Sequence, residues 1–177
     1  MHYSNSSAIA LQASSLFLFL MLEKKNIRKR IFSGLLSGIA FDSFMHLVYF
    51  LITAMPFLKF KTEFAAGAAL SVFLDIDHAL EARSLDPEKL LSLGRRPYTH
   101  SILFSLVVSL SVIIVSSNPA LSYIVFVSML SHVMRDFSSG VTHVFYPFKQ
   151  PSSYAFEFYV LFSVALAFLN RTILSLF

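Results

Sequence analysis

The sequence contains no cysteine, so neither disulfide bonds nor thiolate metal ligands can form. Charged residues are also scarce, at 14% of the 177 residues, whereas an average soluble domain carries about 25%. Hydrophobic residues instead make up 56% of the chain, with 20 phenylalanines and no tryptophan, and the mean hydropathy is +0.69. So few charges cannot cover a water-facing surface, and the composition therefore predicts a membrane protein.

No stretch of the sequence alternates polar and apolar residues over the length of a strand, so the apolar stretches are expected to be helices. Several are shorter than the roughly 20 residues that an isolated membrane helix needs, and short helices cross a membrane only when they pack together. We predict an all-α, polytopic membrane protein with about 4–6 membrane helices. The apolar stretches cover residues 8–22, 31–58, 64–76, 101–116, 120–134 and 154–169.

The basic residues indicate an orientation. A cluster at residues 24–30 follows the first apolar stretch, as on the cytoplasmic side of a membrane helix. Alternation of the helices then places residues 79–98 and 135–153 inside too, with eleven Lys and Arg inside and three outside. The first stretch has its basic residues after it, the reverse of a signal peptide, so we expect an additional helix there. The net charge of +4 lies mainly at these flanks, so we expect membrane lipids and not nucleic acid as partners.

Four short clusters of ionisable residues lie inside or at the ends of the apolar stretches. Charged side chains are costly in a membrane and usually mark function there. Asp and His are also ligands of zinc and other divalent ions. The predicted orientation brings the last three clusters to one face, the cytoplasmic one. The clusters are residues 42–46, 75–78, 95–101 and 132–136.

Two of the clusters share a helical spacing. His132 and Asp136 are four residues apart, as are Asp42 and His46, so each pair lies on one face of a helix. Each pair could hold a metal ion, but an ion pair or a carboxylate–histidine hydrogen bond also explains the spacing. His46 is the better ligand candidate of its pair, while Asp42 is either a ligand or a partner that orients the His46 ring.

The cluster at residues 75–78 is the most specific, because Asp75, Asp77 and His78 follow an apolar run directly. Two neighbouring carboxylates repel each other unless a cation or an arginine offsets them, which favours a metal site.

In the third cluster, Thr99 or Ser101 can cap the following helix, and its free N–H groups favour an anion. Arg95 and Arg96 would suit a phosphate there. Alternatively, these arginines only flank a membrane helix on its cytoplasmic side, and His100 is a surface histidine.

The order of the clusters resembles the YdjM-type family of membrane-bound metal-dependent hydrolases, also described as LexA-binding, inner-membrane-associated hydrolases. Its members open with an Asp-x-x-x-His segment or a simple His segment. They then carry a Pro-Asp-Ile-Asp-His block, a His-Arg-x-x-Thr-His-Ser block and a Ser-His-x-x-x-Asp block that runs to a Gly and an aromatic–Pro pair. The matching stretches are residues 42–46, 74–78, 95–101 and 131–136, then Gly140 and Tyr146-Pro147. The likeness covers residues 41–165. Residues 1–40 therefore look like an added N-terminal helix and basic linker, and residues 41–177 like the hydrolase domain.

The sequence also departs from the family pattern. Leu74 replaces a Pro and Met45 replaces a frequent Thr, neither of which removes a ligand. Arg95, however, stands where many members have His, so a ligand or proton donor would be missing. His143 stands where many members have an apolar residue or Pro, and we hypothesise that it compensates for that loss.

The residues and the resemblance together imply a divalent ion, Zn²⁺ or Mn²⁺ by ligand type, that activates a water against a lipid or other phosphoester. Asp77 would accept the proton of that water, and Arg96, with Arg95, would hold the anionic oxygens of the substrate. The number of candidate ligands also permits a two-metal site. The candidate ligands are His46, Asp75, Asp77, His78, His100, His132 and Asp136, and the candidate supporting or substrate residues are Asp42, Arg95, Thr99, Ser101 and His143.

The competing class is a non-enzymatic membrane protein. It could be a scaffold with a structural metal or polar site, a regulator that captures a soluble cytoplasmic protein, or a metal transporter with ligands near mid-membrane. If residues 31–58 form one helix from the cytoplasmic side, His46 lies about 22 Å along it, apart from the other clusters. A single site at the cytoplasmic face therefore predicts a helix break near residues 41–45, with residues 31–41 along the interface.

Overall fold

The computed structural model describes residues 5–24, 35–84, 86, 89, 97–139 and 155–177. These residues form helices and no strand, which confirms the all-α prediction. A short 3-10 helix, η1 (Met55–Lys59), lies between α3 and α4. The α-helices are α1 (Asn5–Glu23), α3 (Leu35–Thr53), α4 (Lys61–Phe73), α5 (Ile76–Ala82), α7 (Ile102–Ser116), α8 (Pro119–Ser139) and α9 (Phe156–Leu174).

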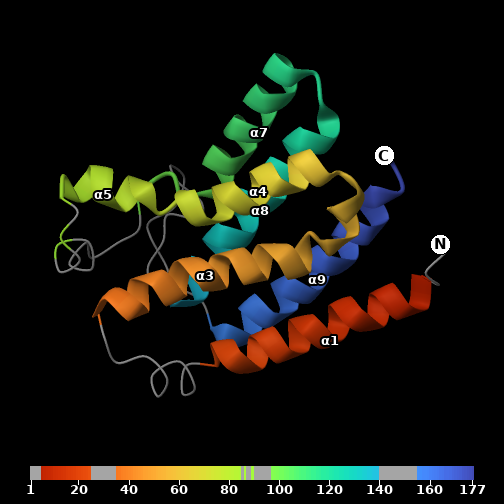
Figure 1. Cartoon of the computed structure of the whole chain (residues 1–177), viewed down its shortest axis with the longest axis horizontal. Coiled ribbons are helices and arrows are strands. Elements are labelled where there is room, and N and C mark those ends of the chain that lie inside the picture. Colours follow the sequence, from red (N-terminus) through yellow and green to blue (C-terminus); the bar gives the residue numbers. More distant parts are fainter. Residues whose placement is uncertain (1–4, 25–34, 85, 87–88, 90–96, 140–154) are drawn as a thin grey trace.

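Helix α8 lies at the centre of the bundle and packs against α3, α4, α7 and α9 (Figure 1). Every residue in its stretch 127–137 is buried, as expected of a helix that is surrounded on all sides. The buried stretch nevertheless includes His132, Arg135 and Asp136. The fold must therefore bring partners for these polar groups from the surrounding helices.

Helix α1 packs against α3 and α9. Its Leu16, Phe19 and Leu20 join Met45 and Tyr49 of α3 in one hydrophobic cluster. Helix α1 is thus part of the bundle that the structure describes. Whether residues 1–40 and 41–177 behave as separate units stays a prediction.

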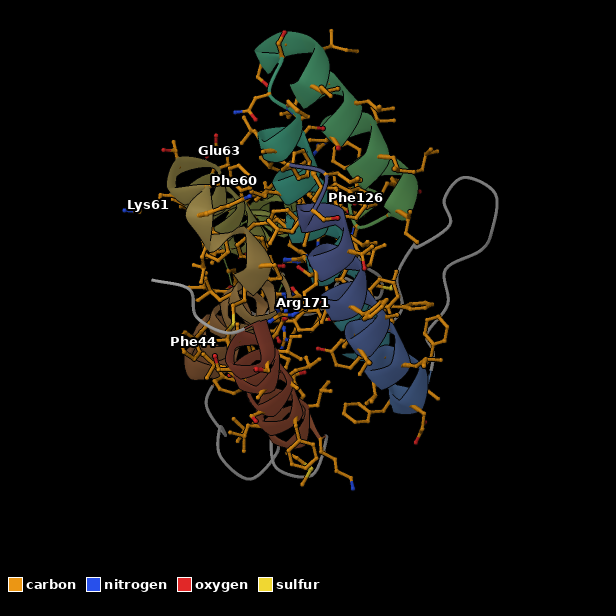
Figure 2. The ribbon with its side chains drawn as sticks, turned by 90° about the vertical axis from the view of Figure 1, so that its right-hand side faces the viewer. Phe44, Phe60, Lys61, Glu63, Phe126 and Arg171 are labelled. Carbon is orange, nitrogen blue, oxygen red and sulfur yellow. The ribbon has the colours of Figure 1, made fainter. Side chains whose placement is uncertain are left out.

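A second set of contacts joins α1 and α9 to the C-terminal end of α3. Gln12 Nε2 donates to the Ile52 carbonyl at 2.8 Å, and Asn170 Nδ2 donates to the Thr53 carbonyl at 2.7 Å. Arg171 lies between these helices (Figure 2), where its Nε donates to Gln12 Oε1 at 2.6 Å. The last carbonyls of a helix have no partner within the helix, so these amide side chains supply the missing donors.

Two helical segments are long and apolar enough to span a membrane, Ser6–Glu23 and Phe156–Leu174. Shorter apolar helices cover Phe41–Thr53 and Ile102–Ser116, and α7 presents exposed apolar side chains such as Ile114 and Val115. The described helices therefore support a membrane location. A total of four to six spans, and a site that faces the cytoplasm, stay predictions.

The expected helix break near residues 41–45 is wrong. Helix α3 runs without interruption from Leu35 to Thr53, and His46 lies within it. The other elements instead meet His46 partway along α3. Helix α4 ends at Phe73 and α7 begins at Ile102, so the segments between helices reach the middle of the bundle.

Gly67 lies where α4 packs tightly against α3 and α8. A Cβ atom at this position would lie 2.7 Å from Ile124 Cγ2 of α8 and 2.7 Å from Phe50 Cζ of α3. The hydroxyl of Ser128 on α8 also donates to the Gly67 carbonyl at 2.7 Å. Only a residue without a side chain fits between these buried groups.

We predict that Gly67→Ala lowers the free energy of unfolding by about 1–3 kcal/mol, because Phe50 and Ile124 must move to admit the methyl group. Thermal unfolding of the detergent-solubilised protein measures the change. Ala66→Ser, a comparable enlargement at an exposed position of the same helix, should leave stability nearly unchanged. Equal stability of the Gly67→Ala protein and the wild type would contradict the tight packing.

Candidate metal centre

A cluster of histidine and aspartate side chains is built on the central helix α8. His132 and Asp136 are one turn apart, and His132 Nε2 lies 3.5 Å from Asp136 Oδ2. His46 of α3 reaches the same place, with its ring stacked on that of His132 at a centroid distance of 3.6 Å. His46 Nε2 lies 3.2 Å from Asp136 Oδ1. The predicted i, i+4 pair of α8 thus meets a histidine from a different helix.

Asp75 and His100 come to the cluster from the ends of other helices. Asp75 lies between α4 and α5, and its Oδ1 is 3.3 Å from His132 Nε2. His100 lies just before α7, with its Nε2 3.1 Å from His132 Nε2 and 3.2 Å from Asp136 Oδ2. Ser101 fixes this approach, because its Oγ caps α7 by accepting from the Phe104 amide at 3.1 Å.

The spacing of these atoms fits a divalent cation. One ligand atom from each of His46, Asp75, His132 and Asp136 can be chosen so that all four lie within 4.8 Å of one another. Asp75, His78 and His100 form a second such group. Tetrahedral zinc holds its ligand atoms at about 2.1 Å, which puts neighbouring ligand atoms about 3.4 Å apart. The distances of 3.1–3.5 Å within the cluster are of this size.

Hydrogen bonds orient two of the imidazole rings. His132 Nδ1 lies 2.9 Å from the Ser71 carbonyl, which can only accept, so this nitrogen carries the proton and Nε2 is left to bind a cation. His100 Nδ1 lies 3.2 Å from Asp77 Oδ2, and Thr99 donates its hydroxyl to the same carboxylate oxygen. Contacts of this kind fix ring orientation and tautomer in known metal sites.

Asp77 therefore lies behind His100. It belongs to neither group of converging ligand atoms among the described residues. The structure brings the other six predicted ligands together and places Thr99 beside Asp77.

Burial divides the cluster into an inner and an outer part. His46, His100, His132 and Asp136 are at most 1% exposed. The side chains of Asp75, Asp77 and His78 are 24%, 15% and 12% exposed. His46 Nδ1 has no hydrogen-bond partner in the part of the chain that the structure describes. Asp75, Asp77 and His78 thus mark the solvent-exposed side of the cluster.

The charges of Asp75 and His100 depend on the ionisable groups around them. Burial alone would raise the pKa of the Asp75 carboxyl, but hydrogen bonds with His100 and His132 hold it well below its usual range. Burial would lower the pKa of His100, but the carboxylates of Asp136, Asp75 and Asp77 raise it well above its ordinary value. A divalent cation must displace the proton of His100, so binding should weaken as the pH falls.

Arg135 forms a separate ion network beside the cluster. It is fully buried, and its guanidinium donates to Glu23 Oε1 at 3.0 Å and to Asp42 Oδ1 at 2.9 Å. Asp42, expected as a metal ligand or as a partner of His46, thus contacts an arginine. Glu23 was not among the predicted site residues, because a carboxylate at the end of an apolar helix carries no signal of its own.

Arg95, Arg96 and His143 lie outside the described residues. Their expected roles, including compensation for Arg95 by His143, stay predictions.

The fold and the site together define a class, an all-helical membrane protein with a buried histidine–carboxylate cluster. Residues 31–175 match the family model described as YdjM inner membrane protein, and the chain belongs to this family. This confirms the resemblance drawn from the sequence blocks. No curated protein and no solved structure matches the chain. The match begins after α1, so Glu23 lies outside the part of the chain that defines the family.

We predict that Asp77→Asn weakens the affinity for Zn²⁺ by about 10–100-fold, the usual effect of losing a partner that orients a ligand. Competition with a chromophoric chelator measures this affinity. Glu81→Gln makes the same chemical change at an exposed position of the same helix and should leave the affinity unaltered. If Asp77→Asn keeps full affinity, Asp77 does not orient His100.

We predict that Glu23→Gln lowers the free energy of unfolding by up to about 3 kcal/mol, the lower end of the cost of breaking a buried ion pair, because Asp42 still balances Arg135. Unfolding followed by circular dichroism provides the measurement, with Glu81→Gln as the matched control. A Glu23→Gln protein as stable as the wild type would show that α1 does not depend on this pair.

Proposed function

We propose that this protein is a metal-dependent hydrolase of the cytoplasmic membrane that acts on a lipid or another phosphoester. The observation that carries the proposal is the convergence of His46, Asp75, His132 and Asp136 within 4.8 Å. When bound, a divalent ion such as Zn²⁺ or Mn²⁺ supplies Lewis acidity, which lowers the pKa of a water and polarises an ester oxygen. Both ions accept this combination of imidazole and carboxylate ligands.

The residues around the cluster divide the remaining tasks. His46, His132 and Asp136 hold the cation from the buried side, and Asp75 holds it from the accessible side. Asp77, bonded to His100, either accepts a proton directly or fixes the ring that does so. In this proposal Arg96, with Arg95, binds the anionic oxygens of the substrate.

The membrane location supports a lipid or lipid-linked substrate. The chain belongs to an inner membrane protein family and has two apolar helices long enough to span a bilayer. In our proposal the protein crosses the membrane several times, with the accessible side of the cluster toward the cytoplasm. The excess of basic residues in the corresponding segments supports this orientation.

A structural metal site is the second candidate function. The burial of His46, His132 and Asp136 favours it, because structural zinc sites have four protein ligands and no open position. In that case removal of the metal should unfold the protein, and no hydrolysis should be found.

Metal content and hydrolysis should be measured on the full chain in detergent, with bis-p-nitrophenyl phosphate and phosphatidylglycerol vesicles as substrates. We expect His132→Ala to lose bound metal and to lower the rate by at least about 100-fold, more than the loss of an orienting partner. His2→Ala, outside every cluster, is the matched control and should behave as the wild type. Metal-loaded wild-type protein with no activity on any phosphoester would refute the hydrolase and leave the structural site.

A further inference from the structure

We propose that the cluster binds two divalent ions, with Asp75 shared between them. This inference rests on the proposed function and adds the number of ions and their arrangement. The inner ion is held by His46, His132, Asp136 and Asp75. The outer ion is held by His78, His100 and Asp75, and it keeps an open position for water and substrate.

The number of donors is the first observation. Four histidines and two carboxylates converge, whereas one tetrahedral ion uses only four ligands. The two groups of converging ligand atoms have one member in common, the Asp75 carboxylate. Its Oδ1 lies 3.3 Å from His132 Nε2 in the first group, and 3.8 Å from His100 Nε2 and 3.9 Å from His78 Nε2 in the second. A single oxygen thus faces ligands of both ions.

Asp136 belongs to the inner group and lies beside the outer one. Its Oδ1 lies 3.2 Å from His46 Nε2, and its Oδ2 lies 3.5 Å from His132 Nε2 and 3.2 Å from His100 Nε2. The two groups are therefore in contact on the buried side as well as through Asp75. Two groups this close together are suited to a pair of ions about 3.5–4 Å apart, the spacing of two-metal hydrolase sites.

Exposure distinguishes the two positions. The histidines of the inner group, His46 and His132, are at most 1% exposed, and four protein ligands close that position. The outer group has only three ligands. Its His100 is buried like the inner histidines, but its His78 and Asp75 side chains are 12% and 24% exposed. A closed four-ligand position suits a structural ion, whereas a three-ligand position that opens to solvent suits catalysis.

Charge favours the second ion as well. Asp75, Asp77 and Asp136 bring three negative charges, while Arg135 is already balanced by Glu23 and Asp42. One divalent ion would balance only two of these three carboxylates. Two divalent ions would balance all three and add a positive charge that attracts an anionic phosphoester.

The test measures the number of bound ions and the coupling between them. The full chain in detergent is stripped with chelator, reloaded with Zn²⁺ and analysed by mass spectrometry, and a second sample is loaded with Mn²⁺ for electron paramagnetic resonance. We expect two Zn²⁺ per wild-type chain and an exchange-coupled Mn²⁺ signal. His78→Ala should retain one Zn²⁺ and show the signal of isolated Mn²⁺. Glu81→Gln, on the same helix as His78 but exposed, should keep two coupled ions.

One Zn²⁺ per wild-type chain, or two Mn²⁺ without coupling, would overturn the proposal whether or not His78→Ala folds. These outcomes are separate from those of the hydrolase test. Two coupled ions without hydrolysis would support the two-ion site with a shared Asp75 and refute the proposed hydrolase activity. One ion with full hydrolysis would refute the two-ion site and support the hydrolase activity.

Discussion

The rest of the structure depends on the burial of three ionisable side chains, His132, Arg135 and Asp136, on the central helix α8. Burial of a charge away from water costs several kcal/mol unless partners compensate for it. No single neighbouring helix supplies all of these partners, because Arg135 leaves α8 in a different direction from His132 and Asp136. Helix α1 therefore provides Glu23, α3 provides Asp42 and His46, and the helix ends of α4 and α7 provide Asp75 and His100.

This constraint explains why α4 and α7 are shorter than α1, α3, α8 and α9. Helices α4 and α7 have 13 and 15 residues, or about 20 and 22 Å of length, less than a hydrocarbon core of about 30 Å. Because they are short, the polar segments beside them reach the middle of the bundle, where Asp75 and His100 meet α8. A longer α4 would carry Asp75 past His132. The close contact at Gly67 keeps α4 against α8 at the height where this meeting occurs.

Much of this arrangement could be predicted from the sequence, because apolar stretches define helices and the i, i+4 spacing places His132 and Asp136 on one face. The distribution of basic residues brought three clusters together, which the distances among Asp75, His100 and His132 now show directly. The depth of the site could not be predicted, since it depends on how far α3 and α8 overlap. The ion pairs of Arg135 with Glu23 and Asp42 could not be predicted either, because a buried arginine can pair with any carboxylate that tertiary packing brings near.

The two polar networks of α8 can coexist because neighbouring helix residues point about 100° apart. Asp136 faces His46 and His100, while Arg135, the preceding residue, faces Glu23 and Asp42. The attachment of α1 therefore uses a face of α8 that the candidate ligands leave unoccupied. Because Asp42 and His46 also share α3, a displacement of α1 would act on both networks through the position of α3 and α8. The N-terminal helix, outside the matched family region, is thus connected through Arg135 and Asp42 to the helices that carry His46 and Asp136.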